Sequence, residues 1–172
     1  NGCRMLTGWF NDEAGRHYLF PEDGHLVKGA LRIDDKDYLF SPEGNMMTGW
    51  QNINGMNFYY NPEDGAMVRG WLGDIANRYY LSPLDGHMVT GLQTIDEQIY
   101  YFDQTGKMMV GWQNIEGMNF YYNPENGAMV KGWLGDIADR YYLSPLDGHM
   151  LTGLQSIDGQ IYYFDQTGKM MV

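Results

Sequence analysis

The sequence predicts an all-β fold, a solenoid of tandem β-hairpin repeats that are each 20–21 residues long. Three observations lead to this prediction. The 62-residue string at 49–110 recurs at 111–172 with seven differences, a glycine opens each repeat, and short aromatic runs alternate with turn residues. A single short hairpin cannot bury its own apolar face. The repeats must therefore stack on one another to form a core.

The repeat boundaries follow from the glycines. Each 62-residue block divides into units of 21, 21 and 20 residues, and two more divergent units precede the first block. The predicted units span 8–28, 29–48, 49–69, 70–90, 91–110, 111–131, 132–152 and 153–172, and residues 1–7 resemble the tail of a further unit. We expect residues 1–172 to form one repeat domain.

Within a unit, the order of residue types predicts a hairpin. A Gly, often followed by Trp, opens a short strand, and a tight turn such as Asn54-Gly55 leads to an aromatic strand such as 98–102. A Pro/Asp/Gly turn and a Gly-x-Met joint then lead to the next unit. No window shows the apolar periodicity of an amphipathic helix.

Strand alternation assigns the two faces of each hairpin. With each unit numbered from its first glycine and the turn at positions 6 and 7, position 2 lies opposite position 11. Trp50 and Tyr59 then share one face, while Phe58 and Tyr60 point to the other face with Ile53. The same register pairs Trp71 with Tyr80, Trp112 with Tyr121, Trp133 with Tyr142, Leu92 with Tyr101 and Leu154 with Tyr163.

Composition excludes several function classes. The net charge of −11 argues against nucleic-acid binding, which requires a basic surface. No apolar run is long enough to span a membrane, and with no signal peptide and no initiator Met we expect a fragment of a longer protein. Cys3 is the single cysteine, so we expect a free thiol. Catalysis needs one asymmetric group of residues, whereas this chain repeats everything. We therefore expect no enzyme activity, no cofactor and no metal.

The repeated Gly-Trp, the aromatic run and the Gly-x-Met joint resemble the cell-wall-binding, or choline-binding, repeats of bacterial surface proteins and phage lysins. The string at 81–91 also resembles the glucan-binding repeats of streptococcal glucansucrases and the repetitive C-terminal region of large clostridial toxins. The resemblance implies a hairpin solenoid with about three hairpins per superhelical turn. It also implies a module that attaches an enzyme or toxin to a surface polymer.

In the choline-binding family, the resemblance places the ligand between consecutive hairpins. Its walls correspond to positions 2 and 9 of one unit and position 11 of the next, with a Met nearby. The candidate ligand-binding residues are Trp50, Tyr59, Tyr80, Trp112, Tyr121, Tyr142, Trp71, Tyr101, Trp133, Tyr163, Met67 and Met129.

Position 9 departs from the family pattern because no unit has Trp there. Asn57 and Asn119 leave the 49/70 and 111/132 junctions uncharged, so these are the best choline candidates. Arg16, Arg78 and Arg140 would repel a quaternary ammonium, so their junctions suit a neutral or anionic sugar better.

Three functions are compatible with these residues. The first is a non-catalytic choline-binding module that attaches a parent protein to choline-substituted teichoic acid at the bacterial surface or outside the cell. The second is a carbohydrate-binding module for glucan or host glycans, and the third is a structural repeat scaffold. A choline-dependent change in tryptophan fluorescence would favour the first, and a glycan-array signal without it the second. An uncapped solenoid also exposes terminal hairpins, which would allow self-association.

Overall fold

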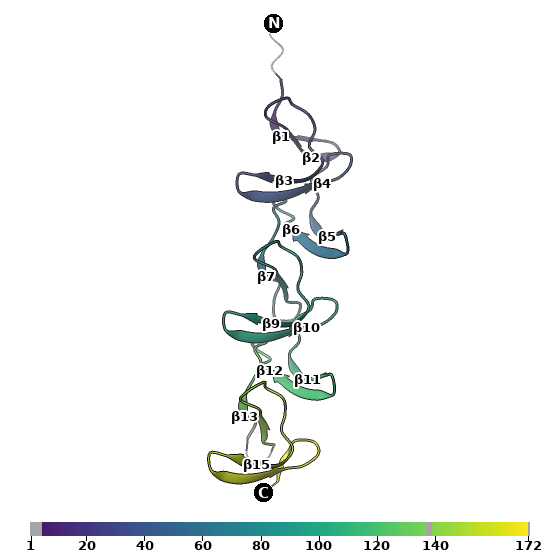
Figure 1. Ribbon diagram of the computed structural model, residues 1–172. Helices are drawn as coiled ribbons and strands as arrows, with labels where there is room; N and C mark the ends of the chain where they lie inside the picture. Colours follow the sequence, from purple (N-terminus) through teal and green to yellow (C-terminus); the bar gives the residue numbers. More distant parts are fainter. Residues whose placement is uncertain (1–4, 137–138, 172) are drawn as a thin grey trace. The chain divides into compact units, whose positions relative to one another are not determined.

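The computed structural model describes residues 5–136 and 139–171 and confirms the all-β hairpin fold. Within these residues the regular secondary structure consists of short antiparallel strands, and almost all of them form separate two-stranded sheets (Figure 1). Cys3 and most of the partial unit at 1–7, which were expected to be a free thiol and the tail of a further repeat, lie outside the described residues.

The strands form one hairpin per predicted unit. The hairpins are β1 (Gly8–Asp12) with β2 (Gly15–Leu19), β3 (Gly29–Ile33) with β4 (Lys36–Phe40), β5 (Gly49–Ile53) with β6 (Met56–Tyr60), β7 (Gly70–Leu72) with β8 (Tyr79–Leu81), β9 (Gly91–Ile95) with β10 (Gln98–Phe102), β11 (Gly111–Ile115) with β12 (Met118–Tyr122), β13 (Gly132–Leu134) with β14 (Tyr141–Leu143), and β15 (Gly153–Ile157) with β16 (Gln160–Phe164). A short strand, β17 (Met170–Met171), adds to β16. Every first strand begins at the glycine that the repeat analysis predicted.

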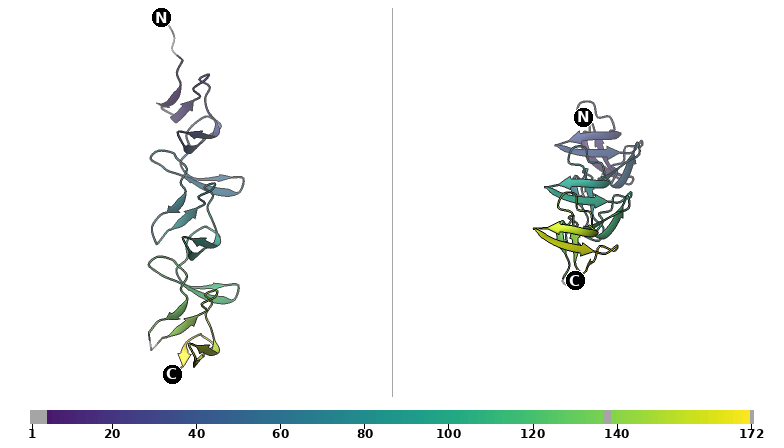
Figure 2. Two further views of the ribbon diagram at one scale, coloured as in Figure 1. Left: turned by 60° about the vertical axis from the view of Figure 1, so that its left-hand side comes forward. Right: turned by 60° about the horizontal axis from the view of Figure 1, so that its bottom comes forward.

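The chain divides into two compact units. One unit comprises Asn1–Leu72 and Tyr80–Met88, and the other comprises Gly73–Tyr79 and Val89–Val172. In each unit, irregular connecting segments join one hairpin to the next (Figure 2). The expectation of one repeat domain over residues 1–172 stays a prediction.

The predicted turn and register are confirmed in the hairpins with five-residue strands. Asn54 and Gly55 both have positive φ, 53° and 84°, as a two-residue turn between twisted antiparallel strands requires. Trp50 lies opposite Tyr59, and Trp112 lies opposite Tyr121.

Two hairpins differ from the predicted tight turn. The strands β7, β8, β13 and β14 have only three residues each, and a longer loop joins each pair. In the first loop, the carboxylate of Asp74 accepts the backbone N–H groups of Ala76 and Asn77, at 3.0 and 3.1 Å. These side-chain-to-backbone bonds form a turn within the loop, in place of strand pairing. The predicted pair of Trp133 with Tyr142 is nevertheless kept.

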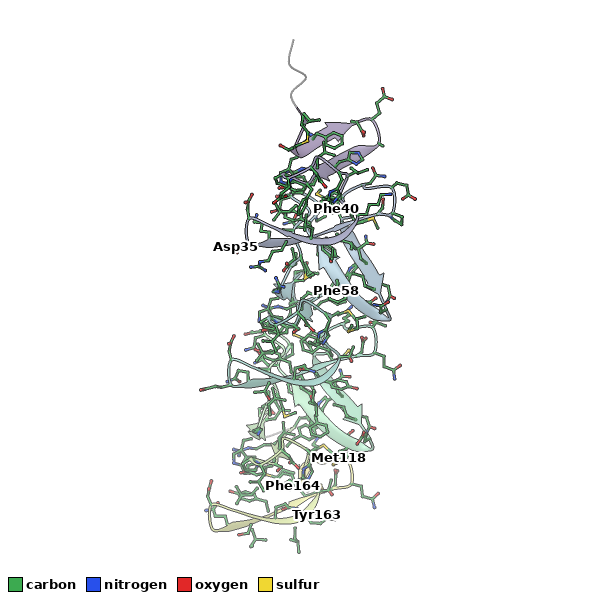
Figure 3. The ribbon with its side chains drawn as sticks, turned by 45° about the horizontal axis from the view of Figure 1, so that its top comes forward. Asp35, Phe40, Phe58, Met118, Tyr163 and Phe164 are labelled. Carbon is green, nitrogen blue, oxygen red and sulfur yellow. The ribbon has the colours of Figure 1, made fainter. Side chains whose placement is uncertain are left out.

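The core runs along the inner faces of the hairpins. The position 12 side chains in seven units are each at most 2% exposed: Phe40, Tyr60, Leu81, Phe102, Tyr122, Leu143 and Phe164. Phe58 is also buried, as predicted, and Ile53 is half-buried. On β16, the neighbours Phe164 and Tyr163 point to opposite faces, and Tyr163 is 51% exposed (Figure 3). In the first of the two compact units, Val27, Ile33, Tyr38 and Phe40 form one hydrophobic core cluster.

A methionine in the joint of seven units, with Leu26 in its place in the first unit, connects neighbouring hairpins. Its backbone N–H donates to the carbonyl of the position 9 residue in the preceding unit, at 2.7–2.8 Å. These bonds run from Met46 to Arg16, Met67 to Asp37, Met88 to Asn57, Met108 to Arg78, Met129 to Ile99, Met150 to Asn119 and Met170 to Arg140. The side chain of Met129 then packs against Gly148 in the following unit, where a Cβ would overlap its sulfur. Such a joint methionine therefore contacts the units on both sides of its own.

We expect the substitution Gly148→Ala to destabilise the protein more than Gly153→Ala does. Both glycines have positive φ, 85° and 72°, but a Cβ at Gly153 meets no atom within 4 Å. Gly153→Ala then reports backbone strain alone, about 1 kcal/mol. Gly148→Ala should cost about 1–3 kcal/mol more, because Met129 must move within a packed joint. Urea unfolding of both variants measures the difference, and equal losses would contradict the packing role of the joint methionine.

The hairpin turn at Asp96-Glu97 predicts a stabilising substitution. Glu97 has φ of 63°, a conformation that glycine adopts more easily, and the equivalent residue in the second block is Gly159. Glu97→Gly should raise the unfolding free energy by about 0.5–1 kcal/mol, after the entropy cost of glycine in the unfolded chain. The reciprocal substitution Gly159→Glu should lower it by a similar amount in the same thermal or urea unfolding experiment. A destabilising Glu97→Gly would show that other contacts of the glutamate outweigh the strain.

Candidate aromatic binding site

The clearest candidate site lies around Trp112, at the beginning of β11. The Trp112 ring packs edge-on against Tyr121 of the same hairpin, with 5.1 Å between ring centroids and an interplanar angle of 66°. The side chain is still 41% exposed, unusually open for the largest aromatic residue of the repeat. An aromatic face is therefore available to a ligand.

The next hairpin supplies a second aromatic wall through Tyr141. Its ring centroid lies 5.1 Å from that of Trp112, again edge-on at 66°. The resemblance had implied Tyr142 in this role, but Tyr142 packs against Trp133 of its own hairpin, at 4.8 Å. The difference follows from strand alternation, because neighbouring residues point to opposite faces. The face of the second hairpin that turns back toward Trp112 carries position 10, not position 11.

These walls border a cavity of about 380 Å³. The residues that line it are Trp112, Gln113, Asn114, Asn119, Tyr141, Met150 and Thr167, and none of these seven carries a charge. The Asn119 side-chain oxygen accepts a hydrogen bond of 2.8 Å from the Asn114 amide across the hairpin. An aromatic floor with a neutral, polar rim can hold an organic cation or the apolar face of a sugar.

The methionine beside this cavity is Met150, which was expected among the joint residues and not in the site. Its N–H donates to the Asn119 carbonyl at 2.7 Å, which brings its side chain to the cavity. The expected Met129 instead bonds to the Ile99 carbonyl and lines a different, more polar pocket with Glu97 and Lys131. Nothing in the sequence distinguishes Met150 from Met129 here, because the one-unit offset between a joint methionine and the carbonyl that it contacts is a property of the stacking.

The unit at 49–69 repeats the local arrangement around Trp50. Trp50 packs edge-on against Tyr59 at 5.2 Å and 67°, and is 42% exposed. Asn57 accepts a hydrogen bond of 2.8 Å from Asn52, and its carbonyl accepts the Met88 N–H at 2.7 Å. Two units one block apart therefore present the same open tryptophan beside an asparagine. Met67, the methionine expected here, donates to the Asp37 carbonyl of an earlier unit.

The other predicted cross-strand pairs are formed, but they do not build the same site. Trp71 packs against Tyr80 at 4.9 Å, so Tyr80 lies with its own hairpin in the same way as Tyr142. Tyr101 and Tyr163 lie opposite Leu92 and Leu154, as the register predicted. With leucine in place of tryptophan, those two hairpins lack the aromatic floor of the candidate site.

At two further tryptophans an arginine covers the ring. The Arg140 guanidinium carbon lies 4.1 Å from the centroid of Trp133, and that of Arg16 lies 4.2 Å from the centroid of Trp9. Both distances are well inside the range of a cation–π interaction. The sequence had suggested these junctions for a sugar, but the guanidinium lies over the ring face on which a sugar would stack.

The turns before the joint methionines hold unusually acidic carboxyl groups. His149 Nδ1 lies 2.7 Å from an Asp147 carboxylate oxygen. Hydrogen bonds from Ser144 and then from His149 lower the pKa of Asp147 from 3.8 to about 2. The equivalent Asp85 also has its pKa lowered to about 2, by Ser82 and His87. These groups stabilise the turn that leads into the site and do not face the cavity.

Over 5–136 and 139–171, no cluster of three or more His, Cys, Asp or Glu side chains is arranged to hold a metal ion. The same residues include no helix of the length and apolarity needed to cross a membrane.

Comparison with known families matches most of the chain. Residues 47–90, 89–113 and 109–152 match the choline-binding repeat, and residues 152–170 match a putative cell wall binding repeat. A comparison with curated protein sequences finds no match.

Solved structures with the same fold include three choline-binding proteins of Streptococcus pneumoniae. CbpJ is 29% identical with a TM-score of 0.88, over 96% of this chain and 58% of that one. Choline binding protein F is 28% identical with a TM-score of 0.86, over 97% and 58%. The choline-binding domain of CbpL is 27% identical with a TM-score of 0.66, over 96% and 87%. The chain thus spans a little over half the length of the first two.

The Asp147 turn gives a pH prediction. Because the folded pKa lies below the ordinary value of 3.8, this carboxylate stabilises the fold at pH above about 4. That contribution is lost as the pH falls through about 2, so the unfolding free energy should decrease over this window. Ser144→Ala removes the main donor and should raise the pKa of Asp147 toward 3.8, as measured by carboxyl-carbon NMR titration. An unchanged titration in the folded variant would contradict the assigned cause.

Proposed function

We propose that this chain, which belongs to the choline-binding repeat family, is a non-catalytic module that holds choline groups of a cell-wall polymer at its Trp50 and Trp112 junctions. The observation that carries the proposal is the open, uncharged cavity at Trp112, with Tyr141 and Met150 as further walls. Aromatic faces attract a quaternary ammonium electrostatically, and this ion needs no hydrogen-bond partner.

The chemistry of the cavity suits a trimethylammonium group. Each aromatic wall contributes about 0.5–2 kcal/mol to a bound cation, the upper end applying when water is excluded. The Met150 thioether adds a polarisable, adaptable contact. The chain's net charge of −11 supports the proposal further, since an acidic field raises the local concentration of cations.

Weak single sites are sufficient for a polymer that repeats its choline groups. Once one group is bound, the next binds at a raised effective concentration, so two or more sites on one chain produce avidity. We further propose that the module attaches a longer parent protein to choline-substituted teichoic acid, outside the cell or at the bacterial surface. The greater length of CbpJ and choline binding protein F, of which this chain spans 58%, supports a parent with additional parts.

A carbohydrate ligand is the second candidate, and the rim of the same cavity supports it. Gln113, Asn114, Asn119 and Thr167 provide amide and hydroxyl groups beside an exposed indole face. A sugar binds by stacking its C–H face on an indole while its hydroxyl groups bond to such neighbours. None of these rim residues is charged, and a neutral rim is compatible with a quaternary ammonium and with a neutral sugar alike.

Substitution of the two open tryptophans tests the proposal. Trp112→Ala should weaken choline binding at its junction by roughly 2- to 30-fold, and Trp50→Ala should do the same at the other. The double variant should lose most of the binding measured by calorimetric titration with choline chloride and, in parallel, with a short glucan.

Trp133→Ala is the matched control, because it removes the same side chain from a junction where an arginine covers the ring. Each variant is checked for folding by circular dichroism. A folded double variant that binds choline as well as the wild type would overturn the assignment. Binding of glucan without choline would favour the carbohydrate candidate, and binding of neither would favour a structural scaffold.

A further inference from the structure

We infer that the side chain at position 9 decides which junctions accept an external cation, because an arginine there occupies the tryptophan face from within the chain. Replacing Arg140 by asparagine should therefore create a further choline site at Trp133. This inference rests on the proposed function and extends it to the selection of sites.

The aromatic surroundings of Trp133 closely match those of Trp112. The tyrosine of the same hairpin lies edge-on at 4.8 Å from Trp133 and at 5.1 Å from Trp112. The next hairpin also supplies a tyrosine to each ring. Tyr162 lies 5.0 Å from Trp133 at 74°, and Tyr141 lies 5.1 Å from Trp112 at 66°. The two aromatic corners are therefore nearly the same, although only one of them is open.

The backbone at position 9 is also shared by the two junctions. The Arg140 carbonyl accepts the Met170 N–H at 2.8 Å, as the Asn119 carbonyl accepts the Met150 N–H at 2.7 Å. The backbone of the joint methionine is thus bound to position 9 in the same way in both units. The side chain of position 9 differs between the two junctions, a guanidinium in one and an amide in the other, and positions 3 and 4 carry Leu134 and Gly135 where the Trp112 unit has Gln113 and Asn114.

The Arg140 guanidinium lies over the tryptophan face at which we propose that choline binds in the other junctions. Arg140 lies 4.1 Å above the Trp133 centroid, and Arg16 repeats this over Trp9 at 4.2 Å in the other compact unit. Exposure follows the same division. The tryptophans with Asn at position 9, Trp50 and Trp112, are 42% and 41% exposed, whereas Trp9 and Trp133 are half-buried.

A tethered cation has two advantages over a free one. Its effective concentration at the ring is set by a short side chain, so a free ligand must exceed millimolar levels to compete on concentration alone. The charge also repels a second cation at contact distance. Asn119 has neither effect, because its amide is neutral and its oxygen accepts the Asn114 amide at 2.8 Å.

Site-resolved fluorine NMR tests this selection. The five tryptophans are labelled as 5-fluorotryptophan, each resonance is assigned by a Trp→Phe variant, and choline chloride is titrated into the wild type and two variants. In Arg140→Asn, the Trp133 resonance should become choline-dependent, with an affinity within about 10-fold of that at Trp112. In Asn119→Arg, the affinity at Trp112 should fall on the order of 10-fold or more.

The control is Arg32→Asn, which removes the same charge from an exposed arginine that pairs with Asp35 and Asp37. It should leave the Trp133 resonance insensitive to choline, which separates a local effect from a change in net charge. Arg140→Gln serves as a second variant if Arg140→Asn does not fold, with folding judged by circular dichroism.

The possible outcomes separate this inference from the proposed function. If Trp50 and Trp112 respond in the wild type but Trp133 stays silent in folded Arg140→Asn and Arg140→Gln, the inference is wrong and the proposed function stands. If Trp133 responds only after the arginine is removed, the inference holds whatever Trp50 and Trp112 do. If choline shifts no tryptophan in any variant, both fall.

Discussion

The backbone hydrogen bond from each joint methionine to the preceding hairpin is the contact on which the rest of the structure depends. It recurs seven times in the described chain at 2.7–2.8 Å and always ends on the carbonyl of position 9. Because a backbone group accepts it, the bond tolerates Arg, Asp, Asn or Ile at that position. The methionine side chain then packs against a turn glycine of the following unit, as Met129 does with Gly148. These contacts hold each hairpin, which is too short to be stable alone, against the neighbouring hairpins.

This stacking determines how the candidate site is assembled. Trp112 and Tyr121 come from one hairpin, whereas Tyr141 and Met150 come from the next. Since successive side chains of a strand alternate in direction, the second hairpin can turn only one set of residues back toward Trp112. That set includes Tyr141 and leaves Tyr142 with its own tryptophan. Thr167, from the unit after that, also lines the cavity, which therefore exists only where successive units meet.

The same geometry separates the stacking contact from the side chain that faces the tryptophan. At position 9 the main chain holds the joint methionine, while the side chain extends beside the tryptophan of its own hairpin. Arg140 covers Trp133, and Asn119 leaves Trp112 open, yet both carbonyls accept the methionine N–H of the next unit. A substitution at position 9 can therefore change occupancy of the aromatic face without loss of the stacking bond. On the proposed function, a repeat protein varies its number of open aromatic sites in this way while its core stays the same.

The sequence by itself determined the repeat boundaries, the all-β class and the cross-strand partners of the tryptophans. These properties are local, since glycine spacing, turn residues and strand alternation act within one hairpin. It also indicated Asn57 and Asn119 as the position 9 residues of the best candidate junctions. Only the tertiary structure decided that Tyr141 and Met150, not Tyr142 and Met129, complete the corner at Trp112. It also decided that Arg140 lies over an indole ring, 4.1 Å from its centroid. These contacts join residues of different hairpins or depend on how a long side chain lies, and the period of the sequence carries no information about either.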